Sequence, residues 1–147
     1  MPTTSLPEIP VRSAEELQQR WAALLAQPVV TTRSLWLAWF DPAGRMMPVV
    51  VPVDDLPLVP GRHTVGGVVD LHDAVVENTD LAGGHLAMAL CRPGTPEVTE
   101  DDQGWADALG DALEGRLDGT WSLHLAADRT VSELVAPPWT HGTAVGG

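Results

Sequence analysis

The residues with the greatest potential for chemistry lie in one stretch of the 147-residue chain, ALCRPGTPEVTEDDQGWADAL, at positions 89–109. An apolar run ends at Cys91, a Pro-Gly loop follows, and acidic residues open a helix. Cys91 is a candidate nucleophile, and the adjacent Arg92 favours its thiolate, because a nearby cation lowers the pKa of a thiol. The alternative is a small buried hydrophobic residue, a common environment for a free cysteine.

The acidic residues after the loop, Glu97, Glu100, Asp101 and Asp102, form the best polar cluster. Thr99 followed three residues later by Asp102 is typical of a helix start, where side-chain oxygens satisfy free backbone N–H groups. Carboxylates are also stabilised near the positive end of a helix dipole. A capped, solvated helix start explains the cluster, and chemistry in a cleft is the alternative.

The spacing of histidine and cysteine favours no metal site. The five histidines, at positions 63, 72, 85, 124 and 141, form no H-x-H or H-x-x-x-H pair, and Cys91 is the single cysteine. An internal disulfide and a cysteine-rich zinc site are therefore excluded. His85 and His124 fall in apolar stretches, where we expect hydrogen-bonded residues of a sheet. The G-x-S-x-G elbow, P-loop and G-x-G-x-x-G motifs are absent, so we expect no cofactor.

The charge balance narrows the range of partners. Eight basic residues against twenty acidic ones give a net charge of −12. Such a field repels nucleic-acid phosphates and anionic membrane surfaces. No apolar stretch reaches the roughly 18 residues of a membrane-spanning helix, and the opening MPTTSLPEIP does not resemble a signal peptide. We therefore expect a cytoplasmic protein that binds neither nucleic acid nor membranes.

Hydrophobic periodicity predicts an α/β domain. We expect helices at 14–27, 65–76 and from 99, and strands at 34–40, 46–53, 85–91, 121–126 and 131–135. Ser13 and Glu16 form a capping pair at the first helix. Gly66 and β-branched neighbours count against the second helix. Pro48 and Pro52 predict that the second strand is an edge strand or is bulged, because proline cannot donate to a ladder.

The predicted fold is a mixed β-sheet of about four to six strands with helices packed on it. Its expected order is α-β-β-α-β-α-β, with a further strand at the end. We expect a single domain at 13–136. A flexible lead-in at 1–12 and a flexible tail at 137–147 flank it.

Three stretches resemble the JAB/MPN domain of RadC-type bacterial proteins, within the broader cytidine-deaminase-like arrangement. SLWLAWFDPAGRMMPVVV is similar to the first hairpin of that family, and HLAMALCRPGTPEVTEDDQGWADAL to its strand, metal-binding loop and helix start. LDGTWSLHLAADRTVSEL is similar to its closing strands, so the likeness extends over 34–135. In the family, two histidines of an H-x-H and an aspartate bind zinc, and an upstream glutamate serves as acid and base. Zinc in such a site turns water into a hydroxide nucleophile.

This chain departs from the family at the metal ligands. The two histidine positions fall on Leu90 and Arg92, and the aspartate falls on Asp102. Leucine has no lone pair, and arginine does not lose its proton to bind a cation. No acidic residue lies between Arg45 and Val53, so the glutamate is unmatched. The resemblance therefore implies a metal-free version of the domain.

The resulting hypothesis is a non-catalytic JAB-like module with a structural or partner-binding role. Arg92, in the place of a metal ligand, would offer its guanidinium to a carboxylate or phosphate beside Asp102, with Cys91 and Glu100 as further binding residues. We expect Arg92 and Asp102 to lie within about 8 Å of each other, because a larger separation excludes direct pairing. The rival hypothesis is an enzyme of another class that uses Cys91 or the acidic cluster around Asp102 in a cleft at the strand ends.

The expected partner is an unidentified protein or a second copy of the chain. A second copy would be contacted through the strand at 46–53 or through the tail around Trp139.

Overall fold

The structure, a computed structural model, describes residues 11, 13–25, 33–57, 59–77, 84–114, 120–128 and 130–137, without the side chains of residues 48 and 49. Its elements are α1 (Ala14–Leu24), β1 (Ser34–Phe40), β2 (Met46–Asp54), α2 (Arg62–Glu77), β3 (His85–Cys91), α3 (Glu100–Leu113), β4 (Thr120–Ala127) and β5 (Thr130–Val135). The predicted α/β class, with helices packed on a mixed sheet, is confirmed.

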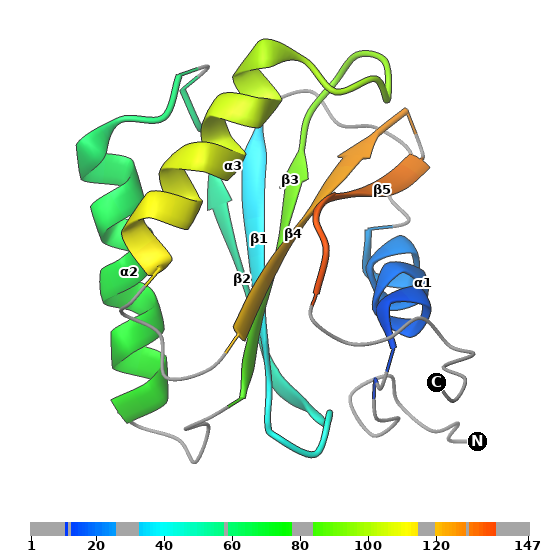
Figure 1. The fold of residues 1–147 in the computed structure, drawn as a ribbon, viewed down its shortest axis with the longest axis vertical. Helices are drawn as coiled ribbons and strands as arrows, with labels where there is room; N and C mark the ends of the chain where they lie inside the picture. The colour runs from blue at the N-terminus through cyan, green and yellow to red at the C-terminus, as the bar shows by residue number, and fades with distance from the viewer. Residues whose placement is uncertain are drawn as a thin grey trace.

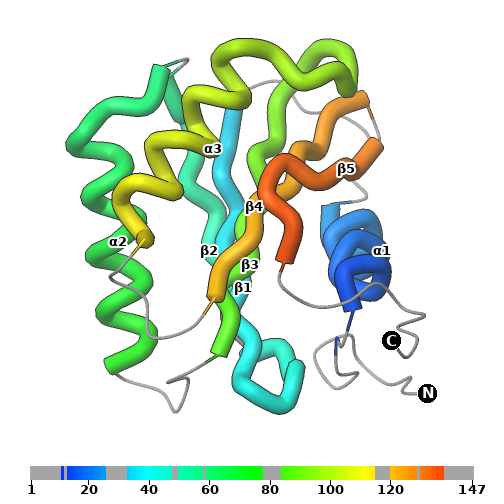
Figure 2. Tube along the Cα trace, viewed as in Figure 1, coloured from blue at the N-terminus to red at the C-terminus, as the bar shows by residue number. Residues whose placement is uncertain are grey.

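The five described strands form one sheet in the order β2-β1-β3-β4-β5 (Figure 1). Strand β1 is antiparallel to both β2 and β3, β3 is parallel to β4, and β4 is antiparallel to β5. Helices α2 and α3 lie against one face of the sheet and α1 lies on the other, as the trace in Figure 2 shows. Because β2, β3 and β4 run the same way, the loops that follow β2 and β3 meet at one end of the sheet.

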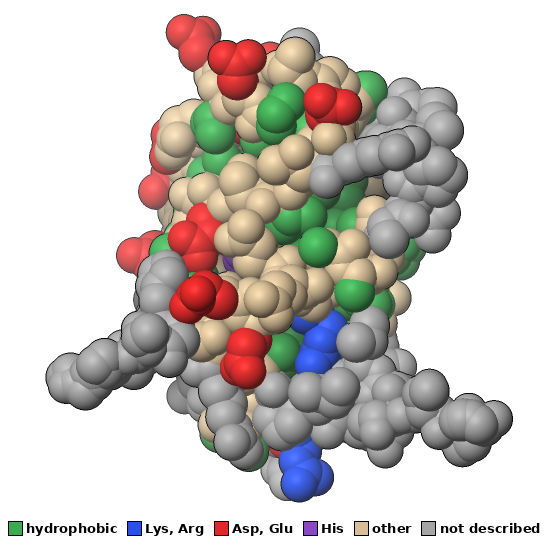
Figure 3. Space-filling model, turned by 90° about the vertical axis from the view of Figure 1, so that its right-hand side faces the viewer, with side chains coloured by type: hydrophobic (Ala, Val, Ile, Leu, Met, Phe, Trp, Pro, Cys, Tyr) green, Lys and Arg blue, Asp and Glu red, His purple; other side chains and the backbone are tan. Residues whose placement is uncertain are grey.

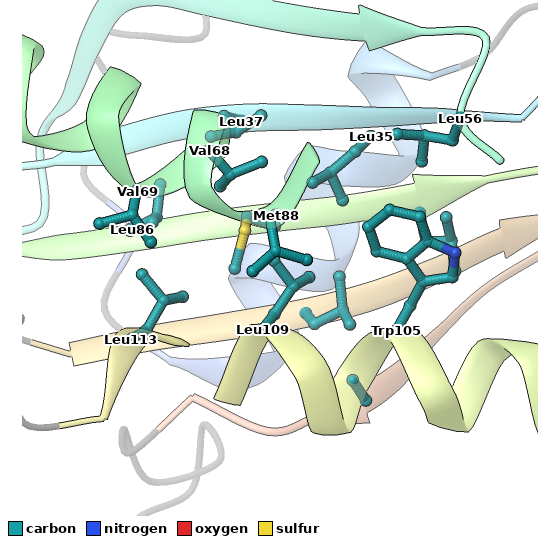
Figure 4. Close-up of a cluster of buried hydrophobic side chains, with 14 of the residues drawn as sticks. Leu35, Leu37, Leu56, Val68, Val69, Leu86, Met88, Trp105, Leu109 and Leu113 are labelled. Carbon is teal, nitrogen blue, oxygen red and sulfur yellow. The ribbon is translucent and has the colours of Figure 1, made fainter. Parts of the chain in front are cut away.

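Alternation along the central strands divides the core into two parts. On β3, every residue is buried: Leu86, Met88 and Leu90 face α2 and α3, whereas Ala87 and Cys91 face α1. The larger part of the core joins the sheet to α2 and α3 (Figure 4), through Leu35, Leu37, Leu56, Val68, Val69, Leu86, Met88, Trp105, Leu109 and Leu113. A strand that is buried on both faces has a nearly continuous apolar sequence, as β3 has.

Two local predictions depended on residues that disfavour regular structure. Helix α2 forms despite Gly66 because Val65, Val68 and Val69 recur at helical spacing and are buried against the sheet. Strand β2 lies at the edge of the sheet, as its prolines predict, and its pairing with β1 shifts between Ala38 and Phe40.

The first and last residues of the described chain are buried. Val11, expected in a loose lead-in, is buried, and its N–H donates to the carbonyl of Gly44 at 2.8 Å. Helix α1 was expected to reach 27 but ends at Leu24, and residues 26–32 lie outside the described part. Pro137 is buried, and the predicted tail around Trp139 lies beyond the described residues. None of the described helices is long and apolar enough to cross a membrane.

Candidate functional site

Arg92 stands at the end of β3, and its side chain is enclosed by the loop that follows. Its Nε donates to Oδ1 of Asp102 at 2.8 Å, and its Nη2 donates to Oδ2 at 2.7 Å. The remaining donors reach backbone carbonyls: Nη1 bonds to Pro93 at 3.1 Å and Thr95 at 2.8 Å, and Nη2 bonds to Glu97 at 2.8 Å. All five N–H groups of the guanidinium are thus used within the chain. The predicted Arg92–Asp102 contact is present as a two-pronged ion pair.

Asp102 belongs to the first turn of α3 and is fully buried. Thr99 and Asp102 form the predicted capping box: the Thr99 N–H donates to Oδ2 at 2.9 Å, and the Asp102 N–H donates to the Thr99 hydroxyl at 3.2 Å. Burial alone would raise the pKa of the Asp102 carboxyl. The hydrogen bonds from Arg92 and Thr99 outweigh burial and hold the pKa below its ordinary value. Asp102 therefore stays ionised and joins β3, the loop and α3.

The loop between β3 and α3 is shaped around the guanidinium. Gly94 has a φ of +102°, a conformation that favours glycine, and a side chain there would approach Nη1 of Arg92 to 3.2 Å. Three carbonyls of the loop point inward to the same cation. The loop therefore has an internal anchor, since each of these carbonyls has a buried partner.

A third charged residue of this cluster was missed by the sequence analysis. Nη1 of Arg33 lies 3.9 Å from Oδ1 of Asp102, and the Arg33 side chain is 17% exposed. This Nη1 atom is buried and has no hydrogen-bond partner in the described part of the chain. Arg33 reaches the cluster because Ser34, the first residue of β1, pairs with Cys91, the last of β3. No spacing rule within a single sequence reveals that pairing.

Cys91 does not share the environment of Arg92. Its side chain faces α1 on the opposite side of the sheet, and it is 4% exposed. Burial raises the pKa of the Cys91 thiol to about 11, against a smaller opposing effect of Ser34. The prediction that Arg92 favours a thiolate is therefore wrong, because consecutive residues at a strand end point to opposite faces. The structure supports the buried-hydrophobe interpretation of Cys91.

The other acidic residues surround the buried pair from outside. Glu97 and Glu100 are exposed and Asp101 is half-buried, so of the predicted acidic cluster only Asp102 is enclosed. Glu100, expected as a binding residue, lies at the surface beside the buried pair. The capped helix start accounts for the arrangement of these side chains.

Two buried histidines lie on the α1 face. His85 is hydrogen-bonded to Thr120 at 2.6 Å and to Ser122 at 2.8 Å, as expected for a sheet residue. His124 differs: it is fully buried, and neither ring nitrogen has a hydrogen-bond partner in the described part of the chain. Burial lowers the pKa of His124 to about 4, and burial together with His124 lowers the pKa of His85 to about 3. Both rings are therefore neutral at pH 7.

The residues at the positions that the resemblance assigns to metal ligands do not fit a zinc ion. Leu90 is buried among apolar side chains, Arg92 carries a positive charge, and both Asp102 oxygens accept hydrogen bonds from neighbours. Within the described residues, no group of three or more His, Cys, Asp or Glu side chains is placed to hold a metal ion. The positive charge that faces Asp102 comes from the guanidinium of Arg92.

Comparisons with protein families, curated proteins and solved structures found no match to the chain.

Proposed function

We propose that this protein is a non-catalytic, JAB-like α/β module with a partner-binding role. The observation that carries the proposal is the Arg92–Asp102 ion pair, with bonds of 2.8 and 2.7 Å. It joins two of the positions that the family resemblance assigns to metal ligands. A guanidinium there replaces the ion as the cross-link between strand, loop and helix.

The surrounding architecture supports the same proposal. A hairpin is followed by two helix–strand units, and the loop after β3 leads into a helix whose first turn holds the carboxylate of Asp102. This is the succession that the resemblance implies. The framework of a hydrolytic site is thus retained without the groups that would activate water.

The hydrogen bonds that Arg92 and Asp102 already make argue against a reaction at the pair itself. Each N–H of Arg92 has a partner in the chain, and Asp102 is fully buried. A substrate would have to break one of these bonds before it gained one. The pair therefore acts as a structural support, and binding takes place on the surface that it holds in shape.

Metal analysis tests whether this position lacks the zinc chemistry of the JAB domain. The chain, purified without a histidine tag, is incubated with one equivalent of zinc, passed through a desalting column and analysed for bound metal. We expect no retained zinc in the wild-type protein. Zinc retained at one equivalent and lost in the Asp102→Asn variant would overturn the proposal, because it would place a metal at this carboxylate.

A further inference from the structure

The face of the sheet that α1 covers encloses two basic rings. His85 lies on β3 and His124 on β4, and both lie on the same face as Ala89, the register partner of His124. His85 is 4% exposed and His124 is fully buried. The layer between α1 and the sheet therefore holds two groups that can gain a proton, on the side of the sheet opposite α2 and α3.

The hydrogen bonds of this layer are incomplete. His85 is bonded to the hydroxyls of Thr120 and Ser122, at 2.6 and 2.8 Å. Neither ring nitrogen of His124 has a partner among the described residues, and the same holds for the buried indole Nε1 of Trp21 in α1. A buried polar atom without a hydrogen bond costs free energy. The contact of α1 with the sheet therefore lacks stabilisation that a fully bonded layer would have.

The charged groups around His124 do not balance a proton on its ring. Glu133 of β5 is its register partner but is half-buried and makes no hydrogen bond to the ring. On α1, Arg20 is buried and Glu16 is exposed. On β3, Cys91 is neutral at pH 7 because burial raises the pKa of its thiol to about 11, and β1 has no charged residue. A proton on His124 would therefore add positive charge to a layer that already contains a buried guanidinium.

Helix α1 can leave the sheet without disturbing the other layer. Its buried residues Leu17 and Trp21 belong to a cluster that shares no residue with the core around α2 and α3. The side chain of Gln18 bonds to the carbonyl of Val131, on the edge strand β5, at 2.9 Å. Figure 3 views this side of the molecule, where hydrophobic side chains reach the surface beside carboxylates. A helix of 11 residues is unstable alone in water, so α1 depends on its contacts with the sheet.

We propose that protonation of His124 and His85 in mild acid detaches α1 from the sheet, while the sheet, α2 and α3 stay packed, and exposes Cys91 with the apolar residues around it. Charged rings need water, which reaches them once α1 has left. Burial lowers the pKa of both rings in the closed protein, so protons bind preferentially to the open form. The inference concerns the face opposite the Arg92–Asp102 pair and does not depend on the proposed function.

The thiol of Cys91 reports the release of α1. It is the single cysteine of the chain, faces α1 and is 4% exposed. Dithiodipyridine reacts with thiols in acid as well as at neutral pH, and its rate with the native chain is divided by its rate with the urea-unfolded chain at the same pH. We expect this ratio to rise about a hundredfold between pH 7 and pH 5, because two histidines take up protons on opening. A ratio that stays the same would overturn the proposal.

Hydrogen exchange in α3 distinguishes release of α1 from unfolding of the whole chain. At pH 5 we expect Cys91 to become exposed at least about tenfold more often than the amides of Trp105 and Leu109, which lie in the other layer. Exposure of Cys91 should also change little in dilute urea, because a local opening exposes little surface. Equal opening constants with equal urea dependence at both places would overturn the proposal, since only global unfolding produces them.

Variants of His124 assign the response. His124→Leu and His124→Gln both remove the ionisable ring, so each should reduce the change in Cys91 reactivity between pH 7 and pH 5 by about tenfold. The matched control is His63→Gln, at an exposed position of α2, and it should respond as the wild type does. A wild-type response in both His124 variants, or a lost response in the control, would overturn the proposal. The comparison of Cys91 with α3 uses the wild-type chain alone and decides the matter even where a variant does not fold.

Discussion

Arg92 and Asp102 meet fork to fork inside the protein, with Nε 2.8 Å from Oδ1 and Nη2 2.7 Å from Oδ2. The two side chains are 4% and 0% exposed, so water does not screen the pair. Paired guanidinium and carboxylate groups of this geometry form strong, directional hydrogen bonds. The pair connects the end of β3 to the first turn of α3, and the guanidinium also donates to three carbonyls of the loop between them.

Removing one charge of the pair should be strongly destabilising. Asp102→Asn keeps the size of the side chain but leaves Arg92 buried without a counter-ion. We expect the free energy of unfolding to fall by about 3–5 kcal/mol, the usual cost of breaking a buried ion pair. Urea denaturation measures it, and Asp101→Asn at the half-buried neighbour should change stability by only about 0.5 kcal/mol. A loss below about 1 kcal/mol for Asp102→Asn would contradict this account of the pair.

The buried histidines should make stability fall in mild acid. The pKa values of His85 and His124 are lowered to about 3 and about 4, so the unfolded chain binds more protons than the folded one below about pH 6.5. Stability is then complete above pH 6.5 and decreases as the pH falls toward 4. Two such groups give a slope of up to about 2.7 kcal/mol per pH unit. Asp102 affects stability at lower pH. Because its pKa is lowered in the folded protein, its contribution to stability is lost only below about pH 4.

Denaturation at a series of pH values measures this slope, and a histidine variant assigns it. His124→Leu removes a buried ring whose nitrogens lack partners, so it should flatten the slope between pH 6 and 4.5 by about half and increase stability at pH 5. His63, which is exposed, provides the control His63→Gln, for which the slope should be unchanged. A slope equal in His124→Leu and wild type would contradict the assignment.

The fold could be predicted because its signals are local. The continuous apolar run of β3 and the Thr99–Asp102 cap depend on neighbouring residues, and each has a direct physical cause. The prolines of β2 indicated an edge strand for the same reason. Helix α2 was the harder case, because Gly66 lowers helix propensity and only burial against the sheet compensates for it.

The candidate site was predictable only where the sequence brings its members close together. Arg92 and Asp102 are ten residues apart on either side of one loop, so their contact followed from a strand, a turn and a helix start. Arg33 joins them through the pairing of β1 with β3, which no local pattern reveals. The environment of Cys91 was misjudged because its direction depends on which face of the strand α1 covers.

Cys91 should resist alkylation in the native protein. Its thiol is buried and its pKa is raised to about 11, so at pH 8 only about one molecule in a thousand carries a thiolate. We expect iodoacetamide to modify the urea-unfolded chain within minutes and the native chain only at the rate of its unfolding, as followed by intact mass. Rapid modification of the native protein would contradict the buried position and restore the rival hypothesis of a thiol enzyme.

The contact of Val11 with the β1–β2 turn should depend on Gly44. The φ of Gly44 is +88°, and a Cβ at this position would collide with the carbonyl oxygen of Val11. The N–H of Val11 donates to the carbonyl of Gly44, so the two residues are in direct contact. Gly44→Ala should therefore lower the free energy of unfolding by about 1–3 kcal/mol, through backbone strain and loss of the Val11 contact.

Gly66→Ala is the matched control, because nothing lies within 4 Å of a Cβ at that position in α2. It should raise stability by about 0.5–1 kcal/mol through higher helix propensity. Thermal and urea denaturation measure the stability of the two variants. Similar stability of both would show that the turn tolerates a side chain at position 44 and that the position of Val11 does not depend on glycine there.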